Sequence, residues 1–217
     1  VDDVGAIRER VPGVAQASAT VNGRVRVAYQ NRNWNTSLLG TGTAYSRMRA
    51  AEPQAGRFFT DAENQRRARV AVIGLTVVRE LFGDVNPLGE TIKINKISFQ
   101  VIGILPVKGA SAWSDEDDIV VIPLLTAMYR VLGKEYVDYI DIQAERREDM
   151  DDVSQAAIDL MIGRHRVPPS LQQDAFMVRN LAEIQSALTE TSRTMAWLLA
   201  SIATISLIVG GIGIMNI

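Results

Sequence analysis

Residues 14–30 have the sequence VAQASATVNGRVRVAYQ. Both halves of this stretch, 14–21 and 24–30, are predicted to be strands. Asn22-Gly23 between them is typical of a two-residue hairpin turn, because both residues tolerate the positive φ that such a turn requires. In the second half valine alternates with arginine, so one face of that strand is expected to contact solvent. The stretch therefore predicts a β-hairpin near the start of the chain.

The segments on both sides continue with a mixture of helices and strands. Asp2 and Asp3 precede an amphipathic helical turn at residues 4–10 and suit a helix N-terminus, and Pro12-Gly13 ends the helix. Further helices are expected at 76–82, 124–132 and 149–164. Further strands are expected at 35–42, 70–73, 91–94, 97–105, 119–122, 137–144 and 176–178. This order of elements predicts an α+β fold whose middle part is mostly β.

The spacing of apolar residues indicates which faces of these elements are buried. Successive residues of a strand lie on opposite faces, and helix residues three or four positions apart share a face. The expected buried positions are Ile97, Phe99 and Val101, then Ile140 and Ile142, then Val153, Ala157, Leu160 and Met161.

Composition excludes several classes of function. The 217 residues include 23 Lys+Arg, 25 Asp+Glu, one histidine and no cysteine. The balanced charge argues against nucleic acid as a main partner, because no basic stripe is present to displace phosphate counterions. The lack of cysteine excludes disulfides, thiol catalysis and zinc sites built on thiolates.

The end of the sequence differs in charge from the rest. Residues 196–217 contain no charged side chain. As a helix they would measure about 33 Å, enough to cross a hydrocarbon core of about 30 Å. They are predicted to form a transmembrane helix, with a buried helix of a soluble core as the alternative. The chain is accordingly expected to be one region of a longer membrane protein.

A seam of mainly apolar residues leads into this segment. Its members are separated alternately by three and four positions, as in a coiled coil. They are Leu181, Ile184, Leu188, Thr191, Met195, Leu198, Ile202, Ile205, Val209 and Ile212. The unbroken register predicts that a stalk helix at 181–195 continues into the membrane helix and packs on another helix. The alternative for the polar part is an amphipathic helix that packs on its own domain.

Two motifs invite a functional interpretation. Residues 83–91, GDVNPLGET, superficially resemble a phosphate-binding loop, but five residues separate the glycines and Glu90 replaces the required lysine. Nucleotide binding is therefore excluded and a turn is expected. An acidic run lacks the ligand spacing of a calcium loop and is interpreted as a solvated loop. The run consists of Asp115, Glu116, Asp117 and Asp118.

The remaining polar and aromatic candidates have structural explanations. His165 is expected to be exposed at the end of a helix, and an acidic group is expected to stabilise the start of that helix. That group consists of Asp149, Asp151 and Asp152. Gly56-Arg57-Phe58-Phe59 is interpreted as part of the core, with an exposed aromatic contact as the alternative. No serine has a recognisable base partner. No catalytic, cofactor-binding or metal-binding residue is predicted.

Residues 205–217 have the sequence ISLIVGGIGIMNI. This stretch closely resembles the start of the permease module of FtsX-like ABC transporters, in particular those of the macrolide-exporter (MacB) type. Short upstream motifs resemble the extracytoplasmic core domain of that family and occur in the same order. They are Pro53, GRFFT at 56–60, VAVIG at 70–74, LFG at 81–83, NPLG at 86–89, FQVIG at 99–103 and Ile122-Pro123.

The resemblance implies a division of the chain into four parts. A porter-like α/β-sandwich subdomain would comprise residues 1–45 and 119–180. A β-rich subdomain, residues 46–118, would be inserted into it. The stalk helix at 181–195 and the transmembrane helix at 196–217 would follow.

The resemblance also implies a function in transport. A periplasmic domain of an inner-membrane permease would couple cytoplasmic ATP hydrolysis to export of a small molecule or peptide by mechanical transmission. The implied partners are a second protomer, an ABC nucleotide-binding domain, membrane lipid, a periplasmic adaptor and an outer-membrane channel. ATP would bind outside this chain, which needs no cofactor of its own. The alternatives are a signalling permease that activates a cell-wall hydrolase and a lipoprotein-releasing permease.

Overall fold

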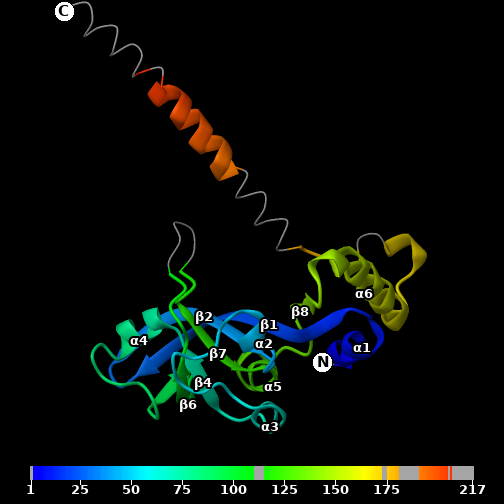
Figure 1. Ribbon diagram of the computed structural model, residues 1–217. Coiled ribbons are helices and arrows are strands. Elements are labelled where there is room, and N and C mark those ends of the chain that lie inside the picture. Colours follow the sequence, from blue (N-terminus) through cyan, green and yellow to red (C-terminus); the bar gives the residue numbers. More distant parts are fainter. Residues whose placement is uncertain (1, 110–114, 173–174, 181–190, 205, 207–217) are drawn as a thin grey trace, which may run out of the picture. The chain divides into compact units, whose positions relative to one another are not determined.

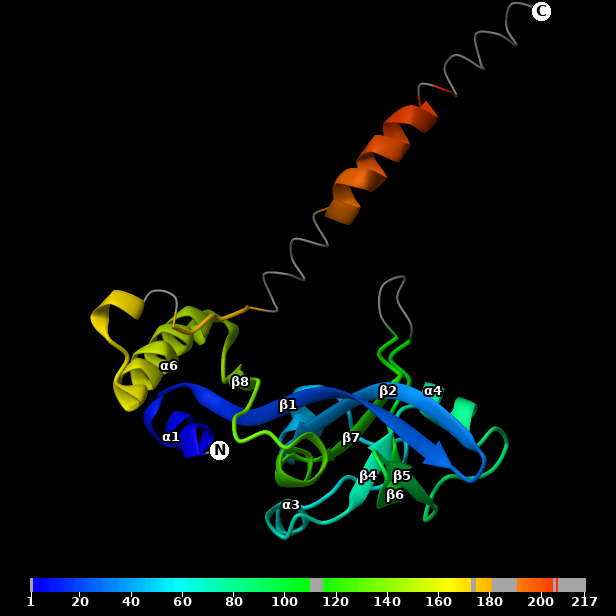
Figure 2. The same ribbon diagram turned by 180° about the vertical axis from the view of Figure 1, so that it is seen from behind.

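The computed structural model describes residues 2–109, 115–172, 175–180, 191–204 and 206. The chain divides into two units, the first ending at Arg166 and the second beginning at Val167. Figures 1 and 2 show the first unit from opposite sides. In both views the long strand β1 (Val14–Tyr29) connects a barrel at one end to a layer with two helices at the other.

Six strands in the described part of the chain pair in a closed ring. Their order around the ring is β1, β2 (Arg32–Thr41), β7 (Ile119–Pro123), β4 (Val70–Ile73), β6 (Ile97–Ile104) and β5 (Thr91–Ile94), which returns to β1. The β2–β7 and β4–β6 pairs are parallel, and the other pairs are antiparallel. We call this ring the barrel. Because the ring is closed, backbone N–H and C=O groups that would be unpaired at the edges of an open sheet can bond to a neighbouring strand. Unpaired edges of that kind could otherwise pair with other chains.

Alternate residues of the ring form the main hydrophobic core. Because successive side chains of a strand point to opposite faces, every second residue can contribute to one interior. Fully buried members of this core include Val21, Val27, Leu38, Ile73, Ile92, Ile94, Phe99 and Ile122. Helix α4 (Leu75–Leu81) and the segment 124–132 add further buried side chains to the same core. The barrel is therefore filled by side chains, as expected for a ring of this size.

Strands β4 and β7 are buried on both faces. Double burial explains why residues 70–73 are an uninterrupted apolar run. The second face of these strands belongs to an outer core formed by Leu39, Ala51, Phe59, Val70, Val72, Leu105 and Val121. Helix α2 (Tyr45–Met48), β3 (Ala55–Gly56) and helix α3 (Asp61–Gln65) lie in the segment that supplies Ala51 and Phe59.

The second part of this unit, which we call the helical layer, consists of α1 (Asp2–Arg10), β8 (Tyr139–Ala144) and α6 (Met150–His165). Strand β8 pairs antiparallel with residues 14–20 of β1, and the short 3₁₀ turn η2 (Arg147–Asp149) leads into α6. The layer has a small core of its own, formed by Ile7, Val11, Ala17, Val153 and Ala157. Half-buried side chains pack against this core, including the expected Ile140, Ile142, Leu160 and Met161.

The hairpin turn predicted at Asn22-Gly23 is wrong. Strand β1 continues through both residues, and the turn lies at Gln30 and Asn31, between the paired residues Tyr29 and Arg32. A Cβ atom on Gly23 would lie 2.5 Å from Leu132 Cδ2, so this glycine permits close packing. The backbone N–H of Asn22 donates to Asp138 Oδ2 at 2.6 Å, across 116 positions of sequence. Local turn propensity contains no information about such distant contacts.

Most of the other elements expected in the first unit are confirmed with small shifts of their ends. The helix expected at 124–132 begins as α5 (Leu124–Thr126) and continues as a π-helix, η1 (Ala127–Leu132). Gly133 ends it with a left-handed φ of 64°. The strand expected at 176–178 is wrong, because these residues have no regular structure. Before these residues, the second unit contains a short 3₁₀ turn, η3 (Pro169–Leu171).

The predicted stalk and transmembrane helix fall mostly outside the described residues. Residues 191–204 are helical and exposed, whereas 181–190 and nearly all of 205–217 are not described. None of the helices in the described ranges combines the length and apolarity needed to cross a membrane. The subdomain boundaries at 45/46 and 118/119 also stay predictions, and the barrel takes strands from both sides of them.

Candidate functional site

Buried and partly buried polar side chains gather where the helical layer meets the barrel. We call this cluster the polar joint and define it as Ser18, Thr20, Thr41, Arg49 and Asp141. Ser18 and Thr20 lie on β1, Thr41 ends β2, Asp141 lies on β8 and Arg49 directly follows α2. Sequence analysis singled out none of these residues. Their only local signal is a run of small polar residues at alternate positions of a strand.

The hydroxyl groups of the joint contact one another in series. Ser18 Oγ lies 3.1 Å from Thr41 Oγ1, which lies 3.3 Å from Thr20 Oγ1. Thr20 Oγ1 also donates to Asp141 Oδ2 at 3.5 Å. All three hydroxyl residues are buried, so each needs such a partner to offset the loss of water. The pairing of β1 with β2 and with β8 brings these residues together.

An ion pair completes the joint. Arg49 Nη2 donates to Asp141 Oδ1 at 2.6 Å, and the Asp141 side chain is only 13% exposed. Burial lowers the pKa of Arg49, but the charge and the hydrogen bond of Asp141 outweigh this effect and raise the pKa above its usual value. The guanidinium therefore stays charged. Charge-assisted hydrogen bonds between partly buried groups are stronger than those between neutral groups.

Two tyrosines flank the ion pair. Burial raises the pKa of Tyr45 to about 12. Burial also raises the pKa of Tyr139, which lies next to Thr20 in the β1–β8 pairing. Both phenols are therefore protonated near neutral pH. Tyr45 packs against the outer core of the barrel, which attaches α2, and with it Arg49, to the barrel.

A second polar contact lies further along β1. Lys134 Nζ lies 2.7 Å from Asp138 Oδ2 and donates to the carbonyl oxygen of Asn22 at 3.0 Å. Burial raises the pKa of Asp138, but the hydrogen bonds from Asn22 and Lys134 outweigh it, so the net shift is downward. These contacts hold the segment between η1 and β8 against the middle of β1.

The acidic run at 115–118 is not the solvated loop that was expected. Asp117 is buried and accepts the backbone N–H groups of Lys108 and Gly109 at 2.8 and 3.1 Å. Asp115 accepts a hydrogen bond from Thr76 Oγ1 at 2.7 Å, which lowers its pKa. Trp34 Nε1 donates to Asp118 Oδ1 at 2.9 Å. Within the described ranges, no group of three or more His, Cys, Asp or Glu residues is placed to hold a metal ion.

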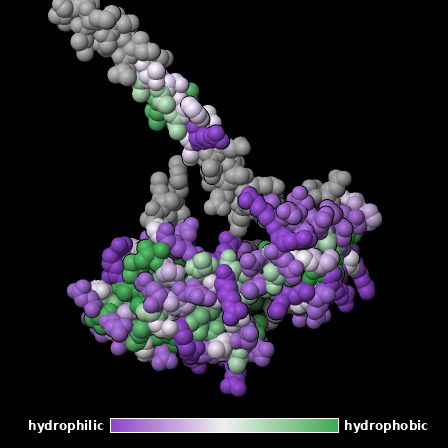
Figure 3. Space-filling model, viewed as in Figure 1, coloured by the Kyte–Doolittle hydropathy of each residue, from purple (hydrophilic) through white to green (hydrophobic). Residues whose placement is uncertain are grey.

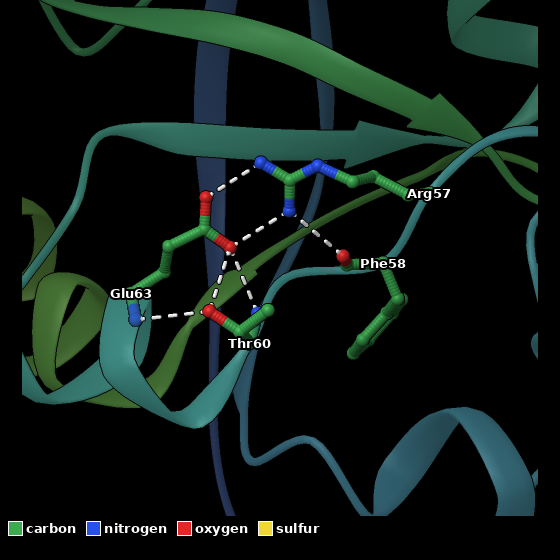
Figure 4. Close-up of polar contacts among 4 residues, drawn as sticks. All are labelled: Arg57, Phe58, Thr60 and Glu63. Atoms are coloured by element: carbon green, nitrogen blue, oxygen red, sulfur yellow. Dashed lines mark hydrogen bonds and ion pairs between the residues drawn. The ribbon is translucent and has the colours of Figure 1, made fainter.

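The segment that contains Arg57 forms a capped turn on the barrel (Figure 4). Thr60 and Glu63 make a capping box at the start of α3. Arg57 contacts both carboxylate oxygens of Glu63, at 2.7 and 2.8 Å. The hydrogen bond from Arg57 is the largest cause of the shift that lowers the pKa of Glu63 to about 2. Phe59 is buried, which confirms the core interpretation for that residue.

The other candidate residues also have structural roles. Residues 83–90 form turns and irregular structure before β5, which begins at Thr91, and Leu88 donates its backbone N–H to Asn86 Oδ1 at 3.1 Å. His165 lies at the end of α6, half exposed, with its Nε2 3.1 Å from Asp3 Oδ2. Asp151 and Asp152 lie in the first turn of that helix, as expected.

These features define an α/β domain in which a filled barrel carries a thin helical layer. The polar side chains described above form hydrogen bonds and ion pairs with other residues of this domain. Residues 1–160 match the family model of the MacB-like periplasmic core domain. This chain belongs to that family.

Relatives of the chain are named as export permeases. It is 54% identical over its whole length to the macrolide export ATP-binding/permease protein MacB of Bdellovibrio bacteriovorus, and covers 33% of that protein. It is 49% identical to the MacB protein of Chlorobium luteolum, again over its whole length, and covers 32% of it. It is 36% identical to the pyoverdine export ATP-binding/permease protein PvdT of Pseudomonas aeruginosa, and covers 32% of it. The chain thus spans about a third of each relative.

Two solved structures show the same fold. The periplasmic region of MacB from Actinobacillus actinomycetemcomitans superposes with a TM-score of 0.71 and 17% identity, over 87% of this chain and 81% of that one. The extracellular domain of the transporter YknZ from Gram-positive bacteria superposes with a TM-score of 0.68 and 21% identity, over 77% of this chain and 84% of that one.

Proposed function

We propose that this chain is the periplasmic region of an inner-membrane ABC-transporter permease that exports a small molecule or a peptide. The observation that carries the proposal is the 54% identity, over the whole chain, to a protein named for macrolide export. The 36% identity to a protein named for pyoverdine export also supports a function in export. Both names favour export over the signalling and lipoprotein-releasing alternatives.

The domain would act by mechanical transmission. ATP bound and hydrolysed in a cytoplasmic nucleotide-binding domain would move the membrane helices, and the periplasmic domains would open or close in response. Transmission requires parts that move as rigid bodies. The barrel supports this role, because a closed ring with a filled core is close-packed and resists deformation. In this proposal no residue of the chain performs covalent chemistry or holds a cofactor.

The partners follow from the same proposal. A second protomer would complete the permease, and membrane lipid would surround its helices. A periplasmic adaptor and an outer-membrane channel would carry the substrate away.

Accumulation of labelled substrates in the host bacterium tests the proposal. Cells that lack the full-length protein should accumulate several-fold more of a radiolabelled macrolide, or of a labelled peptide siderophore, than parental cells. Resupply of the full-length protein should restore the parental level. Resupply of a full-length protein with an inactivated nucleotide-binding domain is the matched control and should not.

Equal accumulation of both probes in all strains would contradict export. Failure of the deletion strain to separate its daughter cells would then favour the hydrolase-activating alternative. Retention of lipoproteins in its inner membrane would favour the lipoprotein-releasing alternative.

A further inference from the structure

We infer that the Arg49–Asp141 ion pair is a latch that holds the helical layer at one orientation on the barrel. The inference goes beyond the proposed function, because it concerns movement within the domain. Only its consequence for export rests on the proposed function. It depends on three observations, which concern the two cores, the attachment of α2 and the composition of the joint.

The barrel and the helical layer have separate cores. The buried residues of the barrel core include Ala19 and Val21 of β1, whereas the layer core includes Ala17 of the same strand. Among the described residues, two partly buried side chains, Val4 and Ile140, pack against both cores. Two parts that do not share a continuous apolar core are expected to move relative to one another unless other contacts prevent it.

Arg49 reaches from one part to the other. It is attached to the barrel on both sides, because Tyr45 packs against the outer core and Ala51 is buried within it. Its guanidinium binds Asp141, which lies in the middle of β8 in the helical layer. The ion pair therefore connects the two parts beside β1, the strand that they share, because Asp141 pairs with Ser18 of that strand. The shared strand and this side-chain contact together hold an orientation that the strand alone would leave free to rotate.

Because of the other residues of the polar joint, replacement of Arg49 alone should disrupt the whole joint. Asp141 also accepts the Thr20 hydroxyl, and Thr20 in turn contacts Thr41. Without Arg49, the little-exposed Asp141 carboxylate would keep, among contacts with the described residues, only that weak 3.5 Å hydrogen bond. A buried charge that has lost its partner is costly and recruits water. Water entering here would separate the hydroxyl contacts and release β8 from α2.

Distances between two spin labels measure this orientation directly. The chain contains no cysteine, so labels can be placed at Gln155→Cys on α6 and Ser98→Cys on β6, both exposed. The measurement uses the full-length protein with any cysteines outside this chain replaced. The parent should give one narrow distance distribution. Arg49→Met and Asp141→Asn should each broaden it at least twofold, and the double variant should broaden it no further.

Two further variants separate the latch from a general loss of structure. Arg49→Lys keeps the positive charge and should restore most of the narrow distribution. Arg57→Met breaks an ion pair of similar length that lies wholly on the barrel, and should leave the distribution unchanged. Asp141→Asn preserves side-chain volume and decides the question if Arg49→Met does not accumulate. Unchanged widths in both single variants would overturn the inference, as would equal broadening by Arg57→Met.

Export measured on the same proteins keeps the two proposals distinguishable. If the parent exports its substrate, Arg49→Met should reduce export at least fivefold while ATP binding stays within twofold of the parent. If the parent exports nothing, the proposed function fails, but the distance distributions still decide whether the latch exists.

Discussion

The barrel and the helical layer share strand β1 but differ in what stabilises them. The barrel core consists largely of branched and aromatic side chains with almost no exposed surface. The core of the layer has five buried residues, two of which are alanines, and none of the residues of β8 is fully buried. In Figure 3 the surface of the layer is mainly hydrophilic, whereas apolar residues gather on the barrel. The difference predicts that the barrel contributes most of the stability of the domain and that the layer depends on its contacts with the barrel.

Buried apolar area explains the difference. Each Å² removed from water contributes about 25 cal/mol, so large side chains stabilise a core more than alanines do. The layer buries too little area to offset much chain entropy without help. Polar contacts such as the joint contribute less to net stability than to the choice of one orientation.

The largest effect should come from the barrel core. Phe99 is 1% exposed, and Phe99→Ala should lower the free energy of unfolding by about 3–5 kcal/mol through lost burial and a residual cavity. Val153→Ala in the layer core removes less apolar surface and should cost about 1–2 kcal/mol. Urea unfolding of the two variants measures both values. Ser98→Ala on the exposed face of β6 is the control and should change little. Equal losses for Phe99→Ala and Val153→Ala would contradict the comparison.

A change of opposite sign is expected at Thr36, in the barrel. Thr36 is completely buried, and its hydroxyl has no hydrogen-bond partner among the described residues. Replacement by valine keeps the shape of the side chain and removes an unsatisfied polar group, so Thr36→Val should raise the free energy of unfolding by about 1 kcal/mol. The thermal midpoint should rise accordingly. Thr36→Ser, which keeps the hydroxyl and leaves a small cavity, should lower it.

The smallest effect concerns pH. The pKa of Glu63 is about 2 in the folded protein, below its ordinary value of 4.5. The carboxylate therefore contributes stability that is fully present above pH about 4.5 and is lost as pH falls toward about 2. Glu63→Gln should remove this part of the pH dependence and leave stability at pH 7 slightly lower. Parallel acid-unfolding curves for parent and variant would show that the Arg57–Glu63 contact contributes nothing measurable.

Helices and strands whose formation is decided by residues close together in the chain could be predicted from the sequence. The strands at 70–73 and 91–94, and the hairpin that joins 91–94 to the next strand, were predicted where they occur. Their apolar patterns are continuous or strictly alternating, and turn residues bound them. The Asn22-Gly23 turn failed because Leu132 and Asp138 contact these residues within a continuous strand. The acidic run was misinterpreted because its partners, such as Thr76 and Trp34, lie far away in sequence.

The candidate site could not be predicted. Ser18, Thr20 and Thr41 are ordinary strand residues, and Arg49, which follows α2, is far in sequence from Asp141 on β8. Composition shows 23 basic and 25 acidic residues but does not show which of them pair. Ion pairing across a fold depends on strand order and register, which the pattern along one strand does not contain.

The sequence by itself determined the balance of charge, the positions of most strands and helices, and the motifs that identify the family. These features depend on the identities of residues that are close together in the chain. Only the tertiary structure decided that the strands close into a ring, that β1 passes through Asn22-Gly23, and that Arg49 meets Asp141. Each of these depends on contacts between distant segments, 92 positions apart in the case of Arg49 and Asp141, and such contacts form only when the whole chain packs around its cores.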